Sequence, residues 1–251
     1  MAKQNGLVKL IGSVGDMTYY KSIDGFLAKE KTTLTRERIT TDPKFRRTRE
    51  NMAEFGNAGK SGKTFRESMQ LLLQNAKDSK LSSRMCKSMM QVLKSDTTNR
   101  RGKRKVASGD ATLLNGFEFN IHAVLSTTLF APYTPNINRQ SGTLSVTIPA
   151  FIPETDVILP VGATHFQFVS AGAAVDFDNQ IFESTTSESD VLPWDENTTT
   201  ALTLTNTVTA ASTLPLFLAF GITFYQEVNG FQYPFAGSTF NALSIIQVDK
   251  V

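Results

Sequence analysis

Lysine and arginine are concentrated in the first 109 residues of this 251-residue chain. That part holds 24 Lys/Arg against 10 Asp/Glu, whereas residues 110–251 hold only Arg139 and Lys250 against 13 Asp/Glu. The two parts therefore carry formal charges of +14 and −11, which sum to the +3 of the whole chain. Opposite charges attract over roughly one Debye length. Each part could thus recruit a partner, either the other half of the same chain or a neighbouring copy.

The hydrophobic pattern changes at about the same place. After residue 110, apolar residues alternate with polar ones, as in strands with one buried face. About seven such runs, separated by turn residues, predict an antiparallel β-sandwich of immunoglobulin-like or jelly-roll-like type. The alternating positions are Phe117, Phe119 and Ile121; Leu144, Val146 and Ile148; Phe166 and Phe168; Val175 and Phe177; Leu202 and Leu204; and the runs 216–225 and 240–248.

A β-hairpin is predicted near the N-terminus. Two strand-like runs, residues 16–22 and 26–31, flank Ile23-Asp24-Gly25. Asp-Gly favours a tight turn because glycine tolerates a positive φ. An isolated two-stranded hairpin is marginal in water. This hairpin is therefore expected to pack on the rest of the chain or on another subunit.

About three helices are predicted to follow the hairpin. The first begins at Thr41-Asp42-Pro43, an N-cap with proline in the first turn, and ends at Gly56. The residues at helical spacing are Phe45, Met52 and Phe55 in the first helix; Phe65, Met69, Leu72, Leu73 and Ala76 in the second; and Leu81, Met85, Met89, Val92 and Leu93 in the third, which starts near Ser79. The predicted fold is α+β, with a basic hairpin-plus-helices domain in residues 1–98, a basic linker in residues 99–110 and an acidic β domain in residues 111–251.

The predicted linker carries the densest positive charge of the chain. Five of the six residues 100–105 are cations, namely Arg100, Arg101, Lys103, Arg104 and Lys105. Such a run could neutralise phosphates and give sequence-independent nucleic-acid binding, although no aromatic stacking residues are interleaved with it. It could equally contact the acidic surface of a protein. We assign these five residues, with Arg46, Arg47 and Arg49 of the first helix, as candidate contacts for nucleic acid or a partner.

Gly56-Asn-Ala-Gly-Lys-Ser-Gly-Lys-Thr64 resembles a phosphate-binding P-loop. That motif needs a glycine five residues before the glycine of Gly-Lys-Thr, and Asn57 occupies the position. The segment also follows a charged helix rather than a buried strand. It is therefore predicted to be a corner between two helices, where glycines permit close approach and a left-handed helix end.

No catalytic or metal site is predicted. His122 and His165 lie on the polar sides of their strand patterns, and Cys86 is a single cysteine in a helical pattern. The acidic run in residues 183–190 lacks the spacing of a calcium loop and is predicted to be solvated. Trp194 is predicted to anchor a loop on the sandwich, with an exposed contact as the alternative. We therefore predict a protein that is not an enzyme and binds no cofactor or small-molecule substrate.

Membrane and export signals are also not predicted. No run approaches about 18 uninterrupted apolar residues, and the apolar stretch around Leu7 is too short for a signal peptide. The chain is expected in the cytoplasm or in a virion-like particle assembled there.

Several N-terminal motifs resemble those of uncharacterised bacterial protein families of a phage-like or otherwise self-assembling structural kind. The motifs are Asp16-Met-Thr-Tyr-Tyr-Lys21 with Asp24-Gly25, Asp42-Pro-Lys-Phe-Arg-Arg-Thr-Arg-Glu50, Glu54-Phe55-Gly56 and, further on, Gly116-Phe-Glu-Phe119. The resemblance covers roughly the first half of the chain. It implies a structural protein and supplies no site residues.

Together these features predict a non-enzymatic structural subunit, such as a shell, tail or filament component. Unlike-charge patches on one chain give a head-to-tail contact that closes into rings or continues as filaments. The alternative prediction is a sequence-independent nucleic-acid-binding protein that uses the basic linker and the helix faces.

Overall fold

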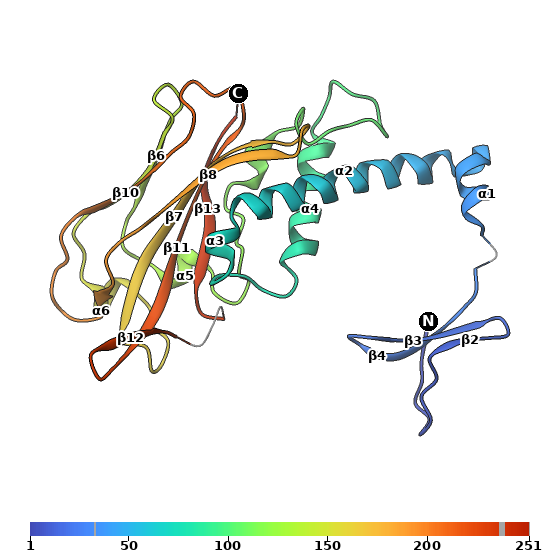
Figure 1. Ribbon diagram of the computed structural model, residues 1–251, viewed down its shortest axis with the longest axis horizontal. Coiled ribbons are helices and arrows are strands. Elements are labelled where there is room, and N and C mark those ends of the chain that lie inside the picture. Colours follow the sequence, from blue (N-terminus) through green and yellow to red (C-terminus); the bar gives the residue numbers. More distant parts are fainter. Residues whose placement is uncertain (33, 236–238, 251) are drawn as a thin grey trace. The chain divides into compact units, whose positions relative to one another are not determined.

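The computed structural model describes residues 1–32, 34–235 and 239–250 (Figure 1). It confirms a mixed α+β chain with antiparallel sheets. The chain forms two compact units, Met1–Glu50 and Asn51–Val251. The boundary falls within helix α2 (Arg46–Ser68), not at the predicted linker near residue 100. The reason is that residues 51–98 share a core with the β-strands that follow them.

The N-terminal unit contains a four-stranded antiparallel sheet. Its strands are β1 (Ala2–Lys3), β2 (Gly12–Val14), β3 (Met17–Ser22) and β4 (Gly25–Glu30), in the order β1-β4-β3-β2. Ser22 pairs with Gly25 across the Ile23-Asp24 turn, and Gly25 has φ 105°. The predicted hairpin is therefore present, flanked by two further short strands.

Two short helical segments complete this unit. Helix α1 (Arg36–Thr41) has Thr35 as its N-cap, and the 3-10 helix η1 (Pro43–Phe45) has Asp42 as its N-cap. The Asp42 side chain accepts a hydrogen bond from the Lys44 N–H at 2.9 Å. The predicted Asp-Pro start is therefore correct, and the chain continues directly into α2.

The N-terminal sheet has almost no core. Among the described residues of this unit, Ala28 is the only buried apolar side chain. Leu7 and Ile23 are fully exposed, Val8 is 77% exposed, and Ile11 is 72% exposed. A sheet of this size is stable when an apolar face is covered, and the described apolar side chains of this unit other than Ala28 are not buried.

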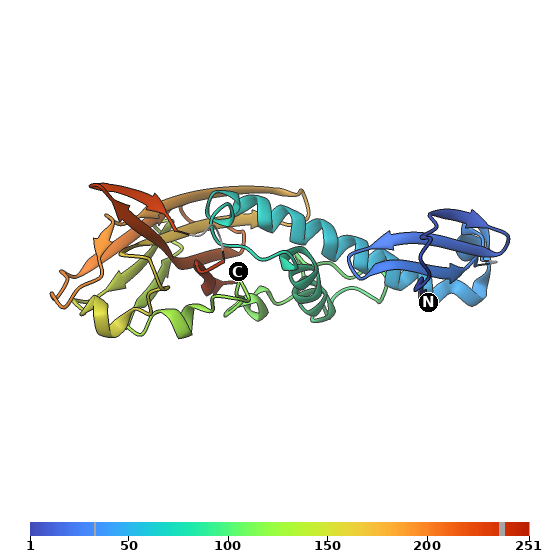
Figure 2. The ribbon, with the colours of Figure 1, turned by 90° about the horizontal axis from the view of Figure 1, so that it is seen from below.

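Helix α2 is followed by α3 (Gln70–Leu73) and α4 (Leu81–Lys94). The apolar positions predicted for the second and third helices are all buried. The first predicted face is wrong at Met52 and Phe55, which are 59% and 62% exposed. The predicted helix corner at residues 56–64 is also wrong, because α2 runs through it without a break. Figures 1 and 2 show α2 crossing α4.

Gly62 explains why a helix with three glycines persists there. A Cβ atom at Gly62 would lie 3.3 Å from Met85 Cγ and 3.6 Å from Met89 Cγ. The missing side chain lets α2 and α4 approach closely, and this packing offsets the poor helix propensity of glycine. The expectation of close approach at the glycines is thus correct at this position, inside a helix rather than at a corner.

The second unit contains two antiparallel sheets. The larger has the order β12-β11-β7-β8, with β13 also paired to β11 and β9 to β7; the smaller has the order β10-β6-β5. The strands are β5 (Thr134–Asn138), β6 (Thr143–Ile148), β7 (His165–Asp176), β8 (Ile181–Glu188), β9 (Leu192–Pro193), β10 (Leu202–Thr207), β11 (Leu216–Val228), β12 (Phe231–Pro234) and β13 (Ala242–Asp249). Three short helical turns lie among them, η2 (Ala111–Leu114), α5 (Leu125–Thr128) and α6 (Pro153–Asp156).

The centre of the larger sheet, formed by β7 and most of β11, is buried on both faces. Ala171 of β7 and Phe217 of β11 pack with the helices, whereas Phe168 and Phe220 of the same strands pack with the smaller sheet. The Phe65 ring of α2 lies 4.7 Å from the Phe217 ring. Figure 1 shows the resulting order, from the smaller sheet through the larger sheet to the helices. This double burial explains the nearly continuous apolar sequence of β11.

One predicted strand is not regular. Residues 117–121 form no strand, although Phe119 donates its N–H to Leu243 O at 2.8 Å and Phe117 O accepts from the Ile245 N–H at 3.0 Å. The segment follows β13 only briefly and then turns away. The remaining alternating runs lie in β6, β7, β10, β11 and β13, with Phe177 just beyond the end of β7.

Candidate interaction site

The edges of the two sheets in the second unit face each other between β8 and β10. Thr185 Oγ1 of β8 donates to Thr207 O at 3.0 Å and accepts from the Thr207 N–H at 2.9 Å. Glu183 Oε2 accepts from the N–H and the hydroxyl of Thr209 at 2.9 and 2.7 Å. At this end, side chains rather than a backbone ladder join the sheets.

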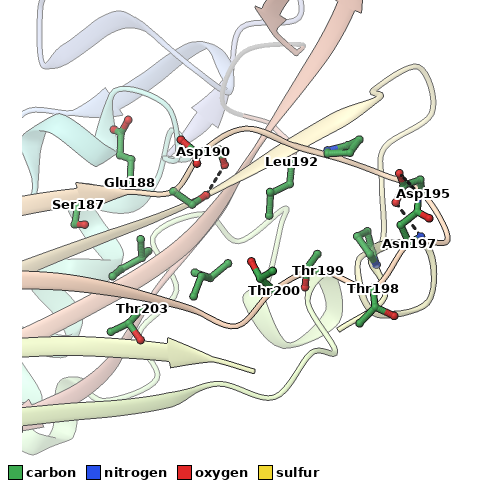
Figure 3. Close-up of a pocket in the computed structure, with 15 residues that line it drawn as sticks. Ser187, Glu188, Asp190, Leu192, Asp195, Asn197, Thr198, Thr199, Thr200 and Thr203 are labelled. Carbon is green, nitrogen blue, oxygen red and sulfur yellow. Dashed lines mark hydrogen bonds between the residues drawn. The ribbon is translucent and has the colours of Figure 1, made fainter. Parts of the chain in front are cut away.

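Beyond these bridges the strands enclose a cleft of about 450 Å³ (Figure 3). One side is formed by the end of β8 and the loop after it, and the other by β10 and the segment before it. Leu192, Leu202 and Leu204 supply apolar contacts, and hydroxyl and amide groups supply most of the rest. The lining residues are Pro153, Ser187–Asp190, Leu192, Pro193, Asp195, Asn197–Thr200 and Leu202–Leu204.

The backbone groups on one edge of β10 point away from β6. The N–H and C=O of Thr207 point toward β8, because both bond to Thr185. In an antiparallel strand, alternate residues direct their backbone groups to the same side. The backbone groups of Thr203 and Thr205 therefore also point away from β6, and Thr203 lines the cleft.

The same reasoning applies to β8. The Ser189 N–H donates to Phe168 O of β7 at 3.0 Å. Two residues earlier on β8, Ser187 is paired with Ser170 of β7. Ser187 and Ser189 thus direct their backbone groups to β7. Thr186 and Glu188 alternate with them and direct theirs away from β7. Because β10 is reached by the Thr185 side chain, the free backbone edge next to the cleft is that of β10.

The cleft is acidic. Its lining includes Glu188, Asp190 and Asp195 and contains no Lys or Arg. Asp195 bonds to Asn197 through the backbone N–H at 3.0 Å and the side-chain amide at 2.8 Å. Part of the predicted solvated acidic loop, residues 183–188, therefore lies in β8, where Glu183 also joins the sheets. The lining thus combines leucines and hydroxyl groups with negative charge.

The cationic run Arg100–Lys105 is an ordered loop rather than a linker. Glu54 of α2 holds it: its Oε1 accepts from the Gly102 N–H at 2.7 Å and from Arg104 Nε at 2.7 Å, and its Oε2 accepts from Arg104 Nη2 at 2.9 Å. Arg101 Nη2 donates to Asn51 Oδ1 at 2.8 Å. Arg104 is therefore engaged in holding the loop on the helix.

Asp96 fixes the other side of this loop. Its Oδ1 accepts from the N–H groups of Thr98 and Asn99, and its Oδ2 accepts from the Lys105 N–H at 3.0 Å and the Asn99 amide. The carboxyl is buried, which by itself raises its pKa, but these four hydrogen bonds outweigh the burial and lower the pKa from 3.8 to about 2. The absence of periodicity in residues 97–105 thus reflects hydrogen bonding to one carboxylate, not a flexible connection.

The remaining predicted contact residues differ in whether their side chains already have partners within the chain. Arg46 and Arg47 pair with Glu50, and Arg49 donates to the carbonyl oxygens of Ile39 and Asp42. Lys105 pairs with Asp178 at 3.0 Å, which links the basic and acidic halves of the chain. Arg100 and Lys103 are exposed; the Lys103 N–H donates to Arg100 O at 2.9 Å, and their side chains make no hydrogen bond or ion pair with any described residue.

The structure does not bring the other motifs singled out in the sequence together into one site. The P-loop-like glycines lie inside α2, so their backbone N–H groups do not surround an open loop. His122 is exposed, and His165 Nδ1 lies 2.9 Å from the Thr164 hydroxyl. Trp194 donates its indole N–H to Val157 O at 3.0 Å, which favours the loop anchor. The described residues contain no group of three His, Cys, Asp or Glu placed to hold a metal ion.

Sequence reasoning missed the residues that organise both surfaces. Asp96 begins an Asp-Thr-Thr-Asn segment, and Asp in this position commonly accepts backbone N–H groups two and three residues ahead. That signal was available. Glu54 and Thr185 have no comparable local signal, because their partners lie 50 and 22 residues away.

Within the described part of the chain, no helix is both long and apolar enough to cross a membrane. No protein-family model, curated protein or solved structure matches the chain.

Proposed function

We propose that the chain is a non-enzymatic structural subunit that assembles with copies of itself into a shell, tail or filament. The observation that carries this proposal is that the N-terminal sheet has almost no core. Among the described residues of that unit, only Ala28 has a buried apolar side chain. Fully burying one exposed aliphatic side chain contributes about 1.5–3 kcal/mol. Contact with another subunit would supply the burial that this unit lacks.

The charge distribution supports contact between unlike surfaces. The basic half of one copy and the acidic β half of another carry formal charges of +14 and −11. A contact between two different surfaces is head-to-tail and continues until a ring closes or a filament forms. We interpret the two packed sheets of the second unit as a β-sandwich that offers the acidic surface in this contact.

The test is size-exclusion chromatography with light scattering, together with negative-stain images of the same fractions. Salt of about 50 mM and about 500 mM gives strong and weak electrostatic attraction, respectively. We expect regular particles at low salt that shrink at high salt. A chain that remains monomeric in low salt at high concentration contradicts the proposal. Amorphous aggregates without a regular outline contradict it as well.

The second candidate function is sequence-independent nucleic-acid binding. It is favoured by Arg100 and Lys103, whose exposed side chains make no hydrogen bond or ion pair with the described residues. They could contact phosphates without breaking an interaction within the chain. Arg104, in contrast, already holds Glu54 and is a poor candidate for this role.

A further inference from the structure

The cleft between β8 and β10 has the features of a missing strand. Both flanking strands are sheet edges, and the backbone groups of Thr203 point away from β6 beside it. The bridges at Thr185 and Glu183 occupy one end with side chains. Unpaired strand edges readily accept another extended chain, whose backbone supplies the hydrogen bonds.

The lining specifies the chemistry of that chain. Glu188, Asp190 and Asp195 favour a cationic occupant. Leu192 and Leu202 are half-buried and favour apolar side chains next to the cation, whereas Leu204 is already buried in the core. The β domain cannot supply such a strand, since its two cations, Arg139 and Lys250, pair with Asp249 and Asp110. The occupant must come from a basic part of a chain.

One segment of the N-terminal unit has all of these properties. Residues 7–11 read Leu-Val-Lys-Leu-Ile and lie outside the four-stranded sheet. The backbone groups of Leu7, Val8 and Ile11 make no hydrogen bond with any described residue. The segment is closed into a loop by the Gln4 side chain, which bonds to the N–H and the C=O of Leu10 on the surface. Such exposed bonds are readily exchanged for bonds to another chain.

We propose that residues 7–11 of one copy add as a strand in the cleft between β8 and β10 of a second copy. This contact rests on the proposed self-assembly and names its interface. In an extended chain, Val8 and Leu10 share one face and Lys9 lies on the other. Val8 and Leu10 then meet the leucines, and Lys9 faces the carboxylates of Glu188 and Asp190.

β10 offers part of the length that this arrangement needs. Five extended residues span roughly 17 Å at about 3.3 Å per residue, and Leu202–Leu204, the part of the lining that lies in β10, covers roughly 10 Å of it. Gly12, with φ 126°, follows residues 7–11 as the first residue of β2.

Two variants test the two sides of the contact. Val8→Asp places a charge on the inserted strand and costs no core, because Val8 is largely exposed. Thr203→Pro removes an N–H that points away from β6 beside the cleft, and proline is tolerated in edge strands at such positions. The matched controls are Val161→Asp, on a fully exposed turn of the second unit, and Thr203→Val, which keeps the N–H. Circular dichroism melts establish that all four variants fold.

The decisive measurement is light scattering of the variants, separately and mixed, at low salt. Each of Val8→Asp and Thr203→Pro should remain monomeric where the wild-type chain and both controls assemble. An equimolar mixture should give particles of twice the monomer mass, because Thr203→Pro donates its strand to the intact cleft of Val8→Asp and no further copy can add. Two separate monomers in the mixture overturn the proposal.

The outcomes also separate this contact from self-assembly itself. Wild-type particles together with unimpaired assembly of both variants reject the strand contact and leave self-assembly standing. A monomeric wild-type chain rejects both. If Thr203→Pro fails to fold, a fluorescent peptide of residues 2–14 replaces it: binding to the Val8→Asp chain is expected, with at least tenfold weaker binding by the same peptide carrying Asp at position 8. Equal binding of the two peptides overturns the proposal.

Discussion

Arg104 and Glu54 form a two-point ion pair between residues 50 positions apart in the chain. The Glu54 carboxylate is 2% exposed and also accepts the Gly102 N–H. The pair lowers the pKa of Glu54, chiefly through the hydrogen bond from Arg104. One of the cations expected to contact a partner thus holds its own loop against α2.

Replacing Arg104 by Gln should destabilise the chain strongly. The Glu54 carboxylate would remain buried without its cation, and breaking a buried pair from one side costs about 3 kcal/mol or more. Urea unfolding at pH 7 measures this loss. Arg100→Gln in the same loop is the control and should change the free energy of unfolding by less than about 0.5 kcal/mol. Equal effects of the two substitutions would show that the Arg104–Glu54 pair does not hold the loop.

Asp96 should make stability fall in acid. Its folded-state pKa of about 2 lies below the ordinary value of 3.8, so the folded chain binds this proton less readily than the unfolded chain. The contribution of Asp96 is therefore fully present above about pH 4 and is lost as the pH falls toward 2. Asp96→Asn should cost about 1–3 kcal/mol at pH 7, because an amide cannot accept all four hydrogen bonds. Unfolding measurements at pH 7 and pH 3 should show a smaller difference at pH 3; a constant difference rejects this role.

The elements with long, regular periods could be predicted from the sequence. Met85 and Val92 are buried in α4 as their spacing indicates, and Leu144 and Val146 are buried in β6. In these segments one periodic face meets one core, so local pattern and tertiary packing agree. The turn at Asp24-Gly25 was predictable for the same reason, since the conformation required there favours glycine.

The sequence-based predictions were wrong where contacts between residues distant in the chain determine the local structure. Three glycines predicted a break in α2, but the contact of Gly62 with Met85 keeps the helix continuous. Met52 and Phe55 follow a helical pattern, yet they are exposed. The cleft depends on β8 and β10 facing each other from two different sheets, and the strand pattern of each carries no information about that arrangement.

If the chain binds nucleic acid through its basic loop, Arg100 and Lys103 should carry the salt dependence. Each phosphate contact contributes about −0.9 to the slope of log K against log salt on duplex DNA. The double variant Arg100→Gln/Lys103→Gln should therefore make the slope shallower by about 1.8. Fluorescence anisotropy with a labelled duplex over a salt series measures it. Arg46→Gln/Arg47→Gln removes the same charge from residues paired to Glu50 and is the matched comparison; a wild-type slope in the loop variant rejects the site.

Gly56 and Gly62 should respond differently to alanine, although both lie inside α2. A Cβ at Gly56 has no neighbour within 4 Å, whereas one at Gly62 would lie 3.3 Å from Met85 Cγ. Alanine is favoured over glycine in a helix interior by up to about 1 kcal/mol, and Gly56→Ala should stabilise the chain by that amount.

At Gly62 the same gain is opposed by crowding in the helix–sheet core. Overpacking typically costs about 1–3 kcal/mol, so Gly62→Ala should leave stability unchanged or lower it. Thermal and urea unfolding of the two variants measure the difference in their stability. The gain in helix propensity is the same in both and cancels in the comparison. If both substitutions stabilise equally, Met85 moves aside without cost and close approach of α2 to α4 does not explain the glycine. A loss at Gly62 alone shows that the segment resembling a P-loop is a helix-packing surface.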